Sequence, residues 1–411
     1  MMPTYPPVFW RFVLCNKNGK PISMLDGIAS DVHLDFILNR AAVMSFSVPS
    51  EDPRVNILHT DGDPYLDVGD RVMKAWRKTP VGSTETPGGW ELKFAGRVWS
   101  LEDTGDGDTV RTSVVCFDPL KILEKRVCRN DDGTFWDDQK PVEFWNGAVY
   151  PAVIGRPEDG SSGAKIIKKL IQRTRDHAGP VHINLSGNWE DTQGMTLSFD
   201  QAMVADAIAT ITDSLTCDLE VTDGGGSPGY LNAYDGTFMR LGGVARLGSD
   251  KTATVKFYYA KTPFTASEYT RTKTLDTLAN AIHFMIKSRT GHRVSAEDDT
   301  SQDDYLVMEE VAALTSFESP DSPYPQKLAD IQLALRKDPR DIVTVLPTPE
   351  SSSLPWNDYW LGDTVSVEAA STPFPVTRQT VSGAQRIYGI SLAIDDDYGE
   401  HVTDLITTPT D

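Results

Sequence analysis

The sequence predicts an α+β protein that is mainly β, with two related small β-domains and helix-containing insertions between them. Three observations support this fold class. A short motif occurs twice in the 411-residue chain, once toward each end. Apolar and polar residues alternate around both copies with the two-residue period of a β-strand. The patterns typical of helices lie mostly between the two copies.

Each copy of the motif combines a Gly-Asp turn with a later alternating run that contains an arginine. Glycine adopts positive φ freely and aspartate bonds its own backbone, so the pair forms a turn from which the next valine starts a strand. The matched positions are Gly69, Asp70, Val72, Arg97 and Trp99 in the first copy, and Gly362, Asp363, Val365, Arg386 and Tyr388 in the second. We interpret these residues as a structural repeat that marks two related β-domains.

The first 125 residues are read as strands joined by turns. Phe9–Leu14 leads into a hairpin turn signal, and Val43–Val48 alternates until Pro49 ends it. Alternation from Leu92 to Val98 returns from Val110 to Cys116, which predicts a hairpin. Asp118 followed by Pro119 is typical of a helix start.

The middle of the chain carries three predicted helices. Apolar stripes predict helices over 164–178, over 201–215 with Asp200 as its cap, and over 325–337. Residues 217–221 predict a strand. We expect helix at 275–286, an acidic loop at 296–304 and an irregular excursion at 129–163.

Composition restricts the function classes. The net charge is −20, which argues against a nucleic-acid-binding surface, because such surfaces need clustered Lys and Arg. It is compatible with a surface that DNA passes without adhering. The sequence contains no apolar run long enough for a membrane span and no secretory signal pattern, so we expect neither. Four scattered cysteines indicate buried thiols rather than a disulfide framework or a CxxC metal site.

No motif supports catalysis, a cofactor or a bound metal. The seven histidines lack metal-ligand spacing, and no nucleophile elbow or phosphate-binding loop occurs. Asp103–Asp108 and Asn130–Thr134 resemble fragments of calcium loops, but neither completes that motif. Paired carboxylates for glycoside hydrolysis stay open, because their separation depends on the tertiary structure. Aromatic residues between Trp136 and Tyr150 are consistent with a sugar-binding face or with a small satellite core.

At this point the order of several short motifs resembles the tail-tip or baseplate hub proteins of tailed phages, especially minor tail proteins of siphophages that infect actinobacteria. The motifs are Phe94–Val98, Val114–Leu120, Cys217–Val221, Trp360–Val365, Gln385–Ile390 and the turn region Asp395–Asp404. Together they span most of the chain, although Thr265–Ser301 does not match.

The resemblance implies a homotrimer in which each chain contributes two β-barrel tube domains, so that three chains form a pseudo-sixfold ring. Such a ring stacks on the distal tail protein or the tail tube ring, contacts the tape measure protein and other minor tail or baseplate proteins, and lets DNA pass without specific binding. The implied location is the virion tail tip, assembled in the host cytoplasm. The expected domains are 1–125 for the first barrel, completed by part of 181–260; 126–200 for a peripheral insertion; 201–260 for a helix and strands that return to the first barrel; and 261–411 for the second barrel, with a helical excursion near 300–340.

Two alternatives remain at this point. A receptor- or carbohydrate-binding adsorption protein predicts saturable binding to host envelope material, with 129–163 as the region of interest. A tail-associated cell-wall lysin predicts degradation of cell wall by the purified protein, and the missing nucleophile and zinc motifs count against it.

Overall fold

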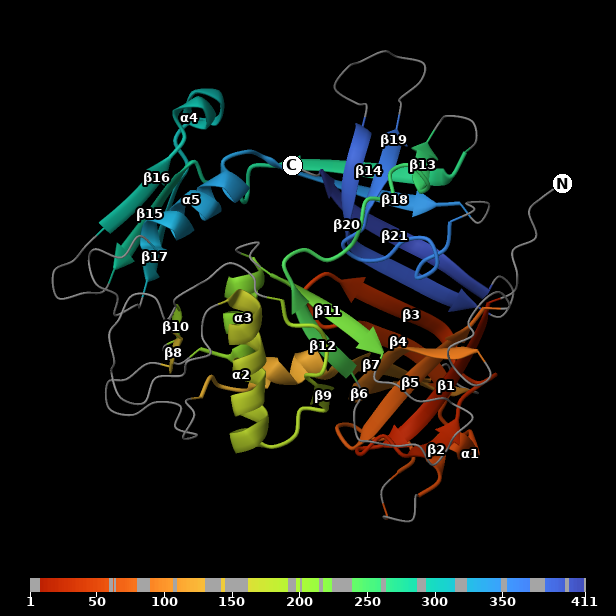
Figure 1. Cartoon of the computed structure of the whole chain (residues 1–411). Coiled ribbons are helices and arrows are strands. Elements are labelled where there is room, and N and C mark those ends of the chain that lie inside the picture. Colours follow the sequence, from red (N-terminus) through yellow and green to blue (C-terminus); the bar gives the residue numbers. More distant parts are fainter. Residues whose placement is uncertain are drawn as a thin grey trace.

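A computed structural model describes residues 8–409 apart from 59–61, 63, 80–88, 106–108, 130–141, 145–161, 191–196, 200–201, 214–216, 224–238, 260–263, 287–292, 315–323, 349–352, 370–380 and 396–398. The described strands are mostly antiparallel, and short helical segments lie around them (Figure 1). The mainly β, α+β fold class is therefore confirmed. One sheet of 13 strands contains both motif copies.

The first part of this sheet is built from the N-terminal residues. Its strands are β1 (Phe9–Asn16), β2 (Pro21–Met24), β3 (Ser30–Ile37), β4 (Val43–Pro49), β5 (Arg71–Lys78), β6 (Trp90–Gly105) and β7 (Val110–Phe117). A short helix, α1 (Pro53–Asn56), follows β4, and the 3-10 helix η1 (Pro119–Lys125) follows β7. The Asp118 carboxylate accepts a hydrogen bond from the Leu120 N–H, which confirms the predicted helix start.

The second part of the sheet is built from the C-terminal residues. Its strands are β13 (Lys256–Tyr259), β14 (Ala266–Thr274), β18 (Arg340–Pro347), β19 (Thr364–Ala369), β20 (Val381–Asp395) and β21 (Gly399–Pro409). The order β14-β18-β21-β20-β3-β4-β7-β6-β5-β1-β2 joins the two parts through β20 and β3. The described pairings therefore form one continuous sheet and do not close either part into a separate barrel.

Five strands in each part have the same order and the same antiparallel pairing. The first part contains β3-β4-β7-β6-β5, and the second contains β14-β18-β21-β20-β19. In both sets the strand after the Gly-Asp turn pairs with the strand that carries the motif arginine. We call these two sets the first and second five-strand units.

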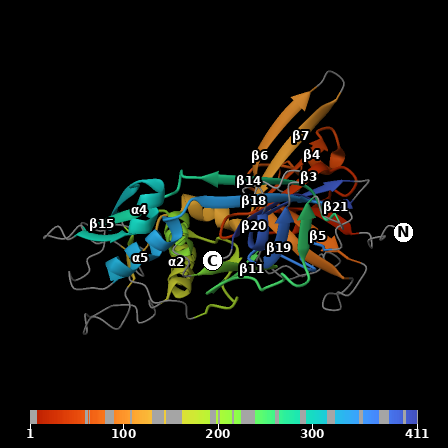
Figure 2. The same ribbon diagram turned by 90° about the horizontal axis from the view of Figure 1, so that it is seen from above.

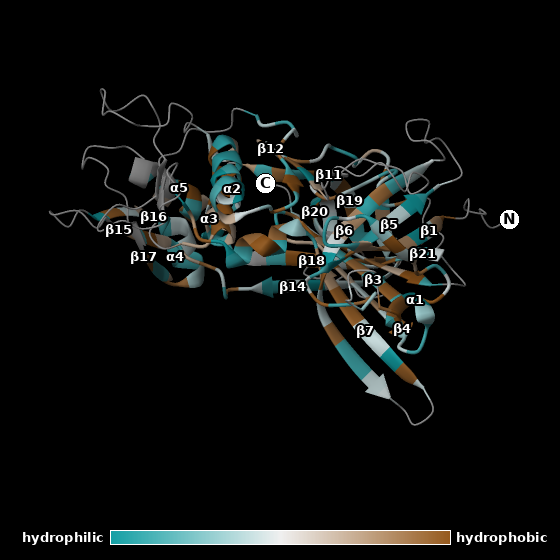
Figure 3. Ribbon diagram, turned by 90° about the horizontal axis from the view of Figure 1, so that it is seen from below, coloured by the Kyte–Doolittle hydropathy of each residue, from teal (hydrophilic) through white to brown (hydrophobic). Residues whose placement is uncertain are grey.

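The middle of the chain forms a separate layer beside the first unit (Figure 1). It contains α2 (Gly163–Ala178), α3 (Val204–Thr212), β9 (Ile183–Asn184), β11 (Asp218–Asp223) and β12 (Met239–Val244), together with the small strands β8 (Val142–Phe144) and β10 (Leu197–Phe199). The buried apolar faces of α2, α3 and η1 share one core with β9, β11 and β12. The hydrophilic face of α2 is turned outward (Figure 3). β9, β11 and β12 form their own sheet, and β13 pairs with β19 of the second unit.

The excursion between β14 and β18 forms a second small layer. It contains β15 (Ala281–Ile286), β16 (Arg293–Glu297), β17 (Glu309–Leu314), α4 (Asp299–Tyr305) and α5 (Tyr324–Arg336). The three strands form a mixed sheet against which α5 packs through Ala329 and Leu333. This layer lies well away from the main sheet (Figures 1 and 2).

Most predicted helices are confirmed, and three local predictions are corrected. The helix expected over 275–286 is wrong, because β15 is a central strand whose described residues are buried on both faces and so lack strand alternation. The loop expected over 296–304 contains α4, whose N-terminus is capped by Asp298. The helix expected over 201–215 is shorter, with Met203 at its N-cap position, while Asp200 and most of the 129–163 excursion lie outside the described residues.

Candidate functional site

The two Gly-Asp turns have matching backbone geometry. Gly69 and Gly362 both adopt positive φ, at 79° and 86°. The N–H of Gly69 donates to the carbonyl of Val98 at 2.8 Å, and the N–H of Gly362 donates to the carbonyl of Ile387 at 2.9 Å. Val98 and Ile387 each follow the motif arginine directly, so the same contact holds each turn against the same place on the neighbouring strand.

The side chain of each motif arginine donates a hydrogen bond to the turn of its own unit. Arg97 donates to the carbonyl of Gly69, and Nε of Arg386 donates to the carbonyl of Gly362 at 3.2 Å. Each guanidinium also reaches the middle layer: Arg97 lies 3.0 Å from Nε2 of His182, and Arg386 lies 2.5 Å from Oδ2 of Asp218. The two arginines therefore connect each unit with the same neighbouring layer.

The aromatic motif residues occupy an identical irregularity. The register between β6 and β7 shifts at Trp99, and the register between β20 and β21 shifts at Tyr388. The rings of Trp99 and Phe117 pack edge-on, with their centroids 5.8 Å apart. The carbonyl of Tyr388 accepts a hydrogen bond from Leu38, just past β3, at 2.8 Å. A bulge at the same strand position in both units is a second shared feature, independent of the turns.

The two motif valines have the same environment, whereas the two motif aspartates differ in burial and in contacts. Val72 and Val365 are both fully buried. Asp70 is half-exposed and lies 3.8 Å from Nζ of Lys17. Asp363 is 8% exposed and accepts hydrogen bonds from the backbone of Ser249 and of Trp360. The Asp363 carboxylate thus ties the second turn to the loop that contains Ser249.

The two units are joined by a buried ion pair as well as by β20 and β3. Arg77 on β5 and Glu400 on β21 form two hydrogen bonds of 2.6 and 3.0 Å, with side-chain exposures of 3% and 1%. The indole N–H of Trp10 donates to the same carboxylate at 3.2 Å. Arg77 also lies over the ring of Trp356 and donates to Asn357. These contacts fix the orientation of one unit relative to the other.

Asp218 is a node at which three parts of the chain meet. Besides Arg386, it accepts hydrogen bonds from the Asn39 amide at 3.0 Å and from the Leu247 N–H at 2.8 Å. Asn39 lies two residues past the end of β3 in the first unit, whereas Arg386 belongs to the second. Asp218, Arg77 and Glu400 were not singled out by sequence reasoning, since nothing in their local spacing shows that they meet.

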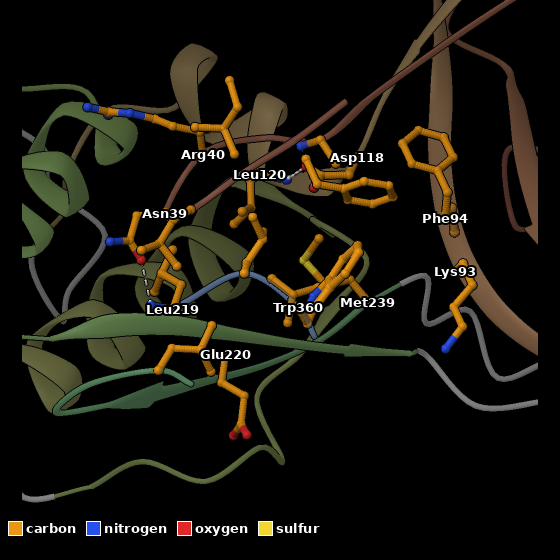
Figure 4. A pocket seen from close by; sticks show the side chains of 18 of the residues that line it. Asn39, Arg40, Lys93, Phe94, Asp118, Leu120, Leu219, Glu220, Met239 and Trp360 are labelled. Carbon is orange, nitrogen blue, oxygen red and sulfur yellow. Dashed lines mark hydrogen bonds between the residues drawn. The ribbon is translucent and has the colours of Figure 1, made fainter. Parts of the chain in front are cut away.

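A cavity of about 430 Å³ lies where the two units and the middle layer meet (Figure 4). Its walls are mainly apolar and include Phe94, Leu219, Met239 and Trp360. Asp118 also lines it, and burial raises the pKa of this carboxyl to about 7, against the effect of hydrogen bonds from the backbone. The cavity is therefore a gap between packed layers that is lined mainly by apolar side chains.

The remaining features to consider are metal-binding clusters, membrane-spanning helices and cysteines. Within the described part of the chain, no cluster of three His, Cys, Asp or Glu residues has a metal-binding arrangement, and no helix is both long and apolar enough to cross a bilayer. All four cysteines are buried and free, and burial raises the pKa of Cys15, Cys128 and Cys217 to about 12. The aromatic region 136–150 lies almost wholly outside the described residues.

Comparison with known proteins identifies the fold. No family model and no curated protein sequence matches this chain. Among solved structures, the chain is similar to a tail protein from Neisseria meningitidis MC58, with 12% identity, a TM-score of 0.53 and coverage of 97% of this chain and 96% of that one. It is also similar to the 43 kDa tail protein of prophage MuSo2 from Shewanella oneidensis, with 11% identity, a TM-score of 0.54 and coverage of 97% and 98%. The third is prophage tail protein gp18 from Listeria monocytogenes EGD-e, with 8% identity, a TM-score of 0.50 and coverage of 97% and 94%. The chain therefore has, over nearly its whole length, the fold of these tail proteins.

Proposed function

We propose that this protein is a structural minor tail protein of a siphophage and forms a trimeric hub at the tail tip. The observation that carries the proposal is the pair of five-strand units, which share strand order, turn geometry and bulge position. The full-length fold similarity to phage tail proteins supports the same assignment. The role is mechanical and does not require catalysis or a cofactor.

The repeat has a direct use in a symmetry adaptor. Three chains with two similar units each present six similar units around one axis, which lets a threefold ring stack on a sixfold tube. In this proposal the units in 1–125 and 261–411 form the ring. The middle layer and the β15–β17 layer lie outside it and meet neighbouring baseplate proteins.

The proposed partners follow from this position. One face of the ring contacts the distal tail protein or tail tube ring, and the tape measure protein ends at the hub. DNA passes through the lumen during ejection without specific binding. The net charge of −20 supports such a lumen, because an acidic wall repels the DNA backbone. A channel lined mainly by Lys and Arg would contradict this part of the proposal.

The oligomeric state of the purified full-length protein tests the hub assignment. We expect a mass of three chains in sedimentation or native mass spectrometry, and a ring in negative-stain images. Permanent subunit contacts in such a ring bury on the order of 2,000 Å² or more, so the trimer should persist at micromolar concentration. A monomer or dimer, both alone and with the distal tail protein added, overturns the proposal.

A further inference from the structure

The outer half of β6 has one described strand neighbour where the matching half of β20 has two. β6 pairs with β5 from Trp90 to Arg97 and with β7 from Arg97 to Gly105. Beyond the bulge at Trp99, residues Ser100–Gly105 pair with β7 alone among the described strands. This half of the β6–β7 hairpin projects from the molecule (Figures 2 and 3).

The second unit shows what occupies the matching position there. β20 pairs with β19 up to Arg386, and beyond its bulge the same edge pairs with β3, from Gly389 opposite Ile37 to Ile394 opposite Val32. β3 is the first strand of the first unit. The junction inside the chain is therefore made by the first strand of one unit lying on the fourth strand of the other.

The strand that corresponds to β3 in the second unit is β14. It stands at one end of the sheet and pairs with β18. Most of its side chains are exposed, from Ser267 to Lys273, and its pairing with β18 is regular from Glu268 onward, after an irregularity at Ser267. It lies apart from the β6–β7 hairpin of its own chain (Figure 1), so pairing between these two elements would need a second copy.

We propose that β14 of one chain pairs antiparallel with Ser100–Gly105 of β6 in the next chain. This inference rests on the proposed hub and deepens it by naming the contact between subunits. It repeats the β3–β20 junction between chains, so every step around the ring uses one kind of joint. A head-to-tail contact of this kind closes into a ring when the rotation per step fits.

The two units fix the register of this ladder. The shared bulge aligns Leu392 with Asp103, and the pairings with the neighbouring strands align Leu34 with Arg271. Because Leu34 lies opposite Leu392 within the chain, Arg271 lies opposite Asp103 between chains. The same register sets Thr270 opposite Thr104 and Thr272 opposite Glu102.

The side chains brought together by this register are complementary. Arg271 meets the carboxylate of Asp103, and Lys273 lies on the same face two residues further along, opposite Leu101. Opposite charges and paired threonines stabilise cross-strand neighbours. In the isolated chain Arg271 is 31% exposed and binds Asp341 on the adjacent strand β18, so its guanidinium already lies on the face that the ladder would use.

Disulfide trapping tests the contact directly. The variant with Thr104→Cys and Thr270→Cys should cross-link between chains under mild oxidation, because directly opposite residues come close enough for a disulfide. The off-register control combines Thr104→Cys with Thr272→Cys, two residues further along the same face, and should cross-link much less. The four native cysteines are buried, so they do not compete.

Charge exchange provides the second measurement. Arg271→Asp alone and Asp103→Arg alone should each weaken association about 100-fold, and the double variant should restore it. Arg175→Glu on exposed α2 is the matched control and should leave association unchanged. Circular dichroism establishes that each variant is folded.

The outcomes separate this inference from the hub assignment. Cross-linking at the predicted pair together with rescue by charge exchange supports both. A trimer of normal mass that fails to cross-link at the predicted pair refutes the ladder and leaves the hub intact. A monomer that neither associates nor cross-links at its highest soluble concentration refutes both.

Discussion

Replacing Arg77 by leucine tests how the two five-strand units are held together. The substitution removes both hydrogen bonds to Glu400 and leaves that carboxylate buried, with the indole N–H of Trp10 as its remaining donor. It also removes the guanidinium from the ring of Trp356. Breaking a buried pair in this way costs about 3–5 kcal/mol, because one charge remains without a counterion.

The measurement is urea unfolding, followed by tryptophan fluorescence and by circular dichroism. Two probes are needed because a chain with several layers can unfold in more than one step. We expect Arg77→Leu to lower the free energy of unfolding by about 3–5 kcal/mol. The double variant with Glu400→Leu should recover part of this loss, because a well-packed apolar pair avoids the desolvation of both charges.

An exposed ion pair in the same protein provides the control. Arg40 and Asp213 lie 3.3 Å apart, with side-chain exposures of 46% and 56%. Arg40→Leu should cost about 1 kcal/mol or less, since solvent screens that pair. If Arg77→Leu costs no more than Arg40→Leu, or if the Glu400→Leu variant adds its full cost, the buried pair does not join the units as argued.

Three further predictions concern single residues. Gly69→Ala should lower the free energy of unfolding by about 1 kcal/mol, because alanine is strained at positive φ. Gly362→Ala should lower it by at least about 2 kcal/mol more, because its Cβ would also meet the Leu247 carbonyl oxygen at 2.6 Å. Thermal unfolding compares the two variants, and equal losses of stability would contradict this packing. Burial raises the pKa of Asp118 to about 7, so the folded state holds a proton that the unfolded chain releases, and stability should fall by up to about 4 kcal/mol as the pH rises from about 4 to about 7. Asp118→Asn should flatten that fall in urea titrations, and an unchanged slope would count against it. The hydroxyl of Tyr359 is buried without a partner in the described part of the chain, so Tyr359→Phe should leave the melting temperature unchanged or raise it, and a clear drop would reveal a missing contact.

The repeated motif could be proposed from the sequence because its residues act locally. A Gly-Asp turn followed by a valine and, later, an arginine in an alternating run is visible without coordinates, since positive φ and strand period are properties of short segments. The structure then adds that Arg97 and Arg386 fasten their own turns. The helix at 164–178 was equally readable, because its apolar stripe and the glycine after it are local signals.

The contacts between the two units could not be predicted from local sequence patterns. Asp218 lies far along the chain from both Asn39 and Arg386, and the pairing of β20 with β3 joins opposite ends of the sequence. Such contacts leave no spacing pattern in a single sequence. The strand β15 was missed for a related reason: its described residues are buried on both faces, so strand alternation disappears.

The β3–β20 pairing inside the chain and the proposed β14–β6 pairing between chains use different kinds of side chain. We attribute the difference to the time at which each pairing forms. The joint inside the chain places Val32, Leu34 and Phe36 of β3 in the main core, where they are buried as soon as the chain folds. At the corresponding positions β14 carries Tyr269, Arg271 and Lys273, and the two charged side chains are exposed in the single chain. A long apolar edge exposed before assembly would pair with any other open strand, and charges on the edge prevent this. In the proposed ring, the same strand pairing uses apolar residues within the chain and charged residues between chains, so the side chains of β14 suit an edge that stays open until a second chain arrives.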